Sequence, residues 1–175
     1  MKTKNIISLF LVLCIVFLSL GVNYSQSETS ITNISLTIGN PNFIINDVIK
    51  EIDPGRNTAP VIKESRTLLP IRAIIEEMGG KVEWINEFKK INITLKGISI
   101  SMWVNDKKML LNNNLVTNDV PPMILNARTY MPLRFIAESI GCNVEWIDTT
   151  KTVNILFDPS TVPAKITYND FDSNP

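Results

Sequence analysis

Two glutamates and two arginines recur in register along this sequence, and they are the first candidates for chemistry. Glu76 and Glu138 each follow an arginine, Arg72 or Arg134, by four positions, which is the spacing of an ion pair on a helix surface. A pair of carboxylates can also act as the acid and base of a glycosidase. We favour the ion pair, because the chain contains no histidine and offers no convincing activated base.

The same arginines are candidate binding residues. A cation in the first turn of a helix opposes the helix dipole, so each arginine needs a partner. The glutamate four residues later, a backbone carbonyl or the face of a tryptophan would serve. A bound anion, such as a cell-wall phosphate or an acidic sugar, is the functional alternative. Trp103 is a third candidate, because an exposed indole forms a stacking platform for carbohydrate or a contact for a partner.

Other chemistry lacks support in the sequence. It contains no Gly-rich phosphate loop, no metal-ligand cluster and no grouping that resembles a catalytic triad. We therefore expect no catalytic residue, no cofactor and no bound metal, and we keep an enzyme of cell-wall metabolism as a minor alternative. Cys142 is interpreted as a small apolar filler beside a helix end and not as a reactive thiol.

An internal repeat is the most informative feature of the chain. Residues 66–95 and 128–157 align without a gap and are identical at fourteen of thirty positions. A weaker match lies upstream, between residues 34–38 and 98–102, so the repeat is about 60 residues long. The shared positions that we interpret as a structural motif are Arg66, Pro70, Glu76, Gly79 and Trp84 in the first block, and Arg128, Pro132, Glu138, Gly141 and Trp146 in the second.

Each block predicts one short helix followed by a β-hairpin. The proline suits the first helical turn, an apolar stripe with helical spacing follows, and the glycine is expected to end the helix in a left-handed conformation. Alternating residues after the helix predict two strands, with both tryptophans in the core, and two further strands precede each helix. The predicted fold class is α+β, with two tandem repeats, each an antiparallel sheet curled around one short helix.

The string Arg-Thr-x-x-Pro-x-Arg, followed by Glu, Gly, Val-x-Trp and Lys, resembles the copper amine oxidase N-terminal domain family. Two copies would cover essentially the whole mature chain. The resemblance implies a small α+β fold used as a stalk or surface module. The family usually carries Asp directly after the Trp, where this chain has Ile85 and Ile147. Nothing resembles the catalytic oxidase domain, and without histidine the imidazole ligands of a copper centre are absent, so copper is not expected.

The two ends of the chain predict export and a polar tail. Residues 1–25 have two lysines followed by an uncharged apolar run, which is typical of a signal peptide, with an uncleaved membrane anchor as the alternative. Residues 31–96 and 97–157 are the two predicted repeats, and residues 158–175 a tail or linker. Loss of the two signal lysines changes 17 basic against 17 acidic residues to 15 against 17. A mature charge near −2 (15 − 17) argues against nucleic acid and anionic membranes as partners.

These observations together predict a function without catalysis. We expect an exported bacterial structural or interaction module, extracellular or at the cell surface, that acts as a stalk-like spacer or binds a cell-envelope component or protein. The alternative is a carbohydrate- or peptidoglycan-binding accessory protein that uses Trp103, Arg72 and Arg134. Pairing of the two repeats within the chain and formation of a homodimer both remain open.

Overall fold

The structure, a computed structural model, describes residues 31–161 and shows a sheet-dominated α+β fold with two short helices. The predicted signal segment and residues 162–175 of the predicted tail lie outside the described residues. None of the helices in residues 31–161 combines the length and the apolar composition needed to cross a membrane.

Three antiparallel sheets contain all the strands of the described residues. The continuous sheet has the order β10-β9-β8-β7-β6, with bounds Asn114–Thr117, Lys108–Leu111, Ile98–Trp103, Lys90–Leu95 and Lys81–Ile85. The composite sheet has the order β13-β14-β1-β2-β3, with bounds Asn143–Ile147, Thr152–Phe157, Thr32–Thr37, Asn42–Ile45 and Val48–Glu51. The hairpin sheet has the order β11-β12-β5-β4, with bounds Met123–Leu125, Arg128–Pro132, Arg66–Leu69 and Val61–Lys63.

Local sequence explains the hairpins and the helix ends. Asn46-Asp47 and Asn112-Asn113 are left-handed at both positions, as a tight hairpin turn requires, and asparagine and aspartate tolerate this conformation. The helices α2 (Arg72–Glu77) and α3 (Leu133–Ser139) end as predicted at left-handed glycines, Gly79 and Gly141. Each glycine N–H donates to the carbonyl three residues earlier, and the next N–H donates to the carbonyl five residues earlier, which together make a Schellman motif.

The prolines differ slightly from the prediction. Pro132 is the N-cap of α3, and Pro70 lies one residue before the N-cap Ile71 of α2, so neither stands inside the first helical turn. Both prolines are buried. The helices are six and seven residues long and cannot be stable alone, so their stability depends on packing.

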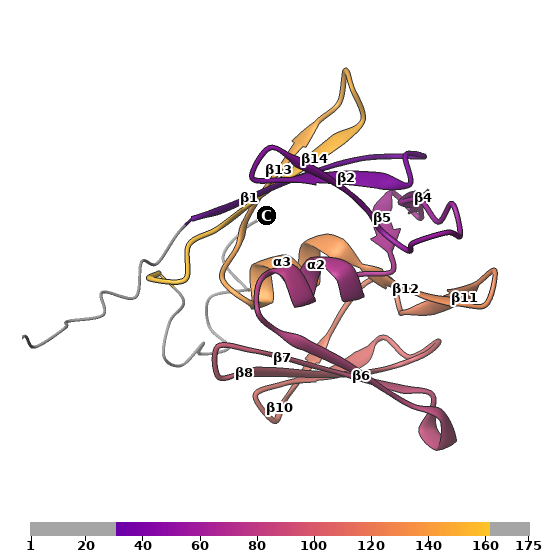
Figure 1. Ribbon diagram of the computed structural model, residues 1–175. Helices are drawn as coiled ribbons and strands as arrows, with labels where there is room; N and C mark the ends of the chain where they lie inside the picture. The colour runs from indigo at the N-terminus through magenta and orange to yellow at the C-terminus, as the bar shows by residue number, and fades with distance from the viewer. Residues whose placement is uncertain (1–30, 162–175) are drawn as a thin grey trace, which may run out of the picture.

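Both helices lie between the two five-stranded sheets (Figure 1). One core cluster contains residues from all these layers: Ile34 and Leu36 from the composite sheet, Ile74 and Ile136 from the helices, and Ile93 from the continuous sheet. The two sheets and the two helices therefore share a single core.

The sheets do not follow the predicted boundary between residues 96 and 97. Lys96-Gly97 forms a left-handed turn that joins β7 to β8, so the boundary falls inside a hairpin of the continuous sheet. Because β8 occupies the edge of β7, strand β1 pairs with β14 instead, from Thr32 opposite Phe157 to Thr37 opposite Thr152. The composite sheet thus combines strands from both predicted repeats.

The register corrects the upstream match that the sequence suggested. Leu36 of β1 stands opposite Val153, and Met102 of β8 stands opposite Ile91, which is the counterpart of Val153. Strand β1 therefore occupies the position of β8 with Leu36 matched to Met102, two residues away from the predicted match. Trp103 consequently has Thr37 as its counterpart.

The shared core predicts that damage in one sheet destabilises the other. Leu36 is 1% exposed, so we expect Leu36→Ala to lower the free energy of unfolding by about 2–5 kcal/mol. In a Trp146→Phe background, urea denaturation followed by far-UV circular dichroism and by fluorescence of Trp84 and Trp103 should show one transition with the same lowered midpoint, although both remaining tryptophans lie in the other sheet.

A matched control is available in the same sheet. Leu156 is 41% exposed on the outer face, so Leu156→Ala should change the stability by less than about 1 kcal/mol. A fluorescence midpoint that does not move in the Leu36→Ala protein would show that the two sheets unfold independently.

Candidate binding clefts

Two clefts of matching composition lie where the hairpin sheet meets a helix and the edge strand of a five-stranded sheet. The Trp84 cleft has a volume of about 560 Å³ and is lined by Arg72, Val82, Trp84, Ile124, Arg128 and Thr129, among others. The Trp146 cleft has a volume of about 170 Å³ and is lined by the counterparts Arg134, Val144, Trp146, Ile62, Arg66 and Thr67. Each cleft therefore presents an indole and two guanidinium groups.

The duplicated sequence motif is divided between the clefts. Arg66 begins the first sequence block but lines the cleft of Trp146, whereas Arg128 begins the second block and lines the cleft of Trp84. The crossing follows from the hairpin sheet, in which β5 pairs with β12. Each cleft is therefore completed only when the two halves of the chain are packed together.

The helix arginines have the partners that the sequence predicted. The guanidinium of Arg72 donates to the carbonyl oxygen of Val82 at 2.8 Å and lies 3.5 Å from Glu76, while Arg134 lies 3.9 Å from Glu138. These exposed pairs stabilise the helices by about 0.3–0.5 kcal/mol each. Burial raises the pKa of Glu138, and the nearby Arg134 opposes this shift. Both glutamates thus serve as ion-pair partners.

The hairpin arginines pair with aspartates that the sequence analysis missed. Arg128 donates to Asp53 at 2.5 Å, and Arg66 forms the matching ion pair with Asp119. The hydrogen bond from Arg128 lowers the pKa of Asp53, and a hydrogen bond from Thr58 at 3.1 Å lowers it further.

These aspartates escaped detection because a gapless comparison does not align them. The loop 52–60 that carries Asp53 has nine residues, whereas the loop 118–122 that carries Asp119 has five. Only the register of the preceding strands, with Lys50 opposite Phe43 and Val116 opposite Met109, places the two aspartates at matching positions.

The prediction that both tryptophans are core residues is wrong for Trp84 and only partly met by Trp146. Trp84 is 37% exposed and Trp146 is partly buried. Trp84 stands opposite the buried Ile91, on the inner face of the sheet, but it belongs to the edge strand β6, where cover is incomplete. Sequence periodicity identified the correct face and could not reveal the position at the edge.

Trp103 lies apart from both clefts. It belongs to β8 and stands opposite Lys90, whose ammonium nitrogen lies 5.2 Å from the centre of the indole ring. Arg72 and Arg134 line different clefts, and Trp103 lines neither. The structure therefore does not bring the three predicted binding residues together.

Metal-ligating and thiol chemistry find no support among the described residues. Within residues 31–161, no three Cys, Asp or Glu side chains are grouped as a metal ion would require. Cys142 is buried as predicted, and burial raises the pKa of its thiol to about 12. The thiol is therefore protonated and unreactive in the folded protein.

The lowered pKa of Asp53 predicts a pH-dependent contribution to stability. An aspartate with a depressed folded pKa stabilises the protein above its unfolded pKa of about 3.9, and this stabilisation is lost as the pH falls through the folded value. We expect Asp53→Asn to lower the unfolding free energy by about 0.5–1 kcal/mol at pH 7 and to have a smaller effect near pH 2, where protonation of Asp53 removes part or all of the stabilisation. Urea denaturation at both pH values measures the difference.

Asp47→Asn serves as the control, because the side chain of Asp47 has no ion pair or hydrogen bond within residues 31–161. This substitution should leave the stability unchanged. An equal loss at pH 7 and pH 2 for Asp53→Asn would mean that the carboxylate charge does not stabilise the loop.

Comparisons with known proteins identify a family and one relative. The copper amine oxidase N-terminal domain family matches residues 49–155. A protein named "Protease inhibitor" from Brevibacillus choshinensis is 27% identical over 90 residues, which cover 51% of this chain and 28% of that protein. This chain thus spans well under half of that relative. No solved structure matches. Since the family match covers more than half of the sequence, the chain belongs to the copper amine oxidase N-terminal domain family.

Proposed function

We propose that this protein is a non-catalytic, exported interaction module that binds a protein partner of the cell envelope through the Trp84 and Trp146 clefts. The observation that carries the proposal is the twofold occurrence of one cleft with an indole and two guanidinium groups. Tryptophan and arginine are the residues that contribute most often to the affinity of protein interfaces.

The matching clefts also support a duplicated origin. In this proposal the chain contains two copies of one unit, and the copies exchange their N-terminal strands, so that β1 to β3 complete the sheet of the second copy. Two matching binding sites then follow from the duplication. A module of this kind engages two copies of a partner, or two sites on one partner, and gains avidity.

The two ends of the described fold favour binding over a spacer function. Thr32 and Phe157 are cross-strand neighbours at the two ends of the described fold. The described fold therefore begins and ends at neighbouring positions, so it spans little distance between these two points. A stalk-like spacer requires ends that are far apart.

The ion pairs of the cleft arginines and the name of one relative both favour a protein as the partner. All four cleft arginines have an acidic neighbour, so their charges are largely compensated and a free anion is a weaker candidate than a protein surface. The relative from Brevibacillus choshinensis is called a protease inhibitor, a name that denotes binding to another protein. Extracellular location rests on the predicted signal peptide.

Retention on isolated bacterial cell envelope tests the proposal. We expect saturable retention of the full chain, at least a tenfold weaker retention of the Trp84→Ala, Trp146→Ala double variant, and loss of retention when the envelope is first treated with a protease. Phe88→Ala is the matched control, because Phe88 is more exposed than Trp84 and lies outside both clefts, and it should bind normally.

Three results would count against the proposal: retention no greater than that of an unrelated protein, survival after protease treatment of the part of the retention that the double variant loses, or equal weakening by Phe88→Ala. Thermal unfolding of each variant confirms that the compared proteins are folded.

A further inference from the structure

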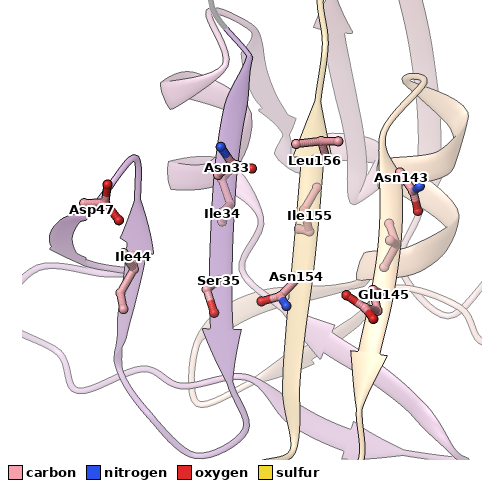
Figure 2. Close-up of a pocket in the computed structure, with 11 residues that line it drawn as sticks. Asn33, Ile34, Ser35, Ile44, Asp47, Asn143, Glu145, Asn154, Ile155 and Leu156 are labelled. Carbon is pink, nitrogen blue, oxygen red and sulfur yellow. The ribbon is translucent and has the colours of Figure 1, made fainter.

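The outer face of the composite sheet contains an open hollow of about 700 Å³ that lies on β13, β14, β1 and β2 (Figure 2). One row of cross-strand neighbours crosses it, from Glu145 to Asn154, Ser35 and Ile44. The smallest side chain, Ser35, belongs to the central strand, and longer side chains stand at both ends of the row. This order of sizes makes the row concave.

The continuous sheet contains a corresponding row of similar residue types, but the polar side chains of that row have partners. Glu83, Asn92, Ser101 and Leu110 are cross-strand neighbours there. The hydroxyl of Ser101 donates to the Asn92 side chain at 2.8 Å, and Lys81 forms an ion pair with Glu83 at 2.6 Å. These polar side chains therefore satisfy one another.

The polar side chains of the row in the composite sheet have no such partners. Within residues 31–161, neither Ser35 nor Asn154 nor Glu145 forms a side-chain hydrogen bond or ion pair. Asn143 stands at the position that Lys81 occupies in the other sheet, so the cation that would neutralise the glutamate is missing. The polar groups of this row in the composite sheet are therefore available to a ligand, whereas their counterparts in the continuous sheet already bond to one another.

The charge of the hollow restricts its ligand. Asp47 and Glu145 line it, and no lysine or arginine does, so anionic ligands are disfavoured. The remaining polar lining consists of Asn and Ser side chains, which both donate and accept hydrogen bonds as vicinal hydroxyl groups require.

Apolar contacts are available beside the polar groups. Ile44 is 44% exposed and Leu156 is 41% exposed, and both line the hollow. They offer surface for the C–H faces of sugar rings. Neighbouring strands are about 4.8 Å apart, which is comparable with the length of one hexose ring along a glycan chain.

We propose that the hollow on the outer face of the composite sheet is a binding site for a neutral sugar chain, held by hydrogen bonds to Ser35, Asn154 and Glu145. This site is separate from the protein-binding role of the Trp84 and Trp146 clefts. It assigns the carbohydrate-binding alternative to residues other than Trp103 and the helix arginines.

Isothermal titration calorimetry of the full chain tests the site with three tetrasaccharides: one of N-acetylglucosamine, one of β-linked glucose and one of galacturonic acid. We expect saturable binding of at least one neutral tetrasaccharide and none of the acidic one. The two neutral probes distinguish an N-acetylated glycan from a glucan. Asn154→Ala and Ser35→Ala should each weaken binding about tenfold, the loss of one to two hydrogen bonds.

Asn92→Ala is the matched control on the other sheet and should bind sugar normally, and Trp84→Ala should also bind normally because it alters only a cleft. The absence of saturable binding to both neutral tetrasaccharides would overturn the proposal, as would equal binding of the acidic one or an equal effect of Asn92→Ala. Envelope retention through the clefts is measured with the Ser35→Ala, Asn154→Ala protein, in which the hollow is disabled, so glycan binding cannot be mistaken for cleft binding. Failure of one proposal is then distinguishable from failure of the other.

Discussion

The pairing of the first described strand with the last is the contact on which the rest of this structure depends. Six residue pairs join β1 to β14, and through them β1 becomes the central strand of the composite sheet. Without this pairing, β13 and β14 would form an isolated hairpin, which is marginally stable in water. The helices α2 and α3, shorter than two turns each, would also lose the sheet that covers them on one side.

The packing of the two halves of the chain against each other also creates the candidate binding surfaces. Arg66 and Arg128 reach clefts whose tryptophans belong to the other half of the sequence, so neither cleft exists in an isolated half. The hollow on the composite sheet likewise needs Ser35 from one end of the chain and Asn154 from the other. In the duplication that we propose, the repeated unit kept the cleft and altered the outer face of its sheet.

The helices and their ends could be predicted from the sequence, but the pairing of the strands could not. Apolar spacing identified both helices, and the glycines at 79 and 141 marked their ends, because helix termination is a local property. Strand β1 could pair with β7 or with β14, and the choice depends on which of these strands has a free edge. The turn at Lys96-Gly97 brings β8 onto the edge of β7 and leaves β14 for β1, which the sequence alone does not reveal. The exposure of Trp84 and the ion pair of Asp53 depend on that arrangement, so both were missed.

Backbone nuclear Overhauser effects measure the central claim most directly. The account predicts cross-strand contacts between the backbone protons of Ile34 and Ile155, and between those of Leu36 and Val153, in the folded full chain. Contacts of these β1 residues with β7 in their place, so that residues 31–96 formed a sheet by themselves, would contradict it.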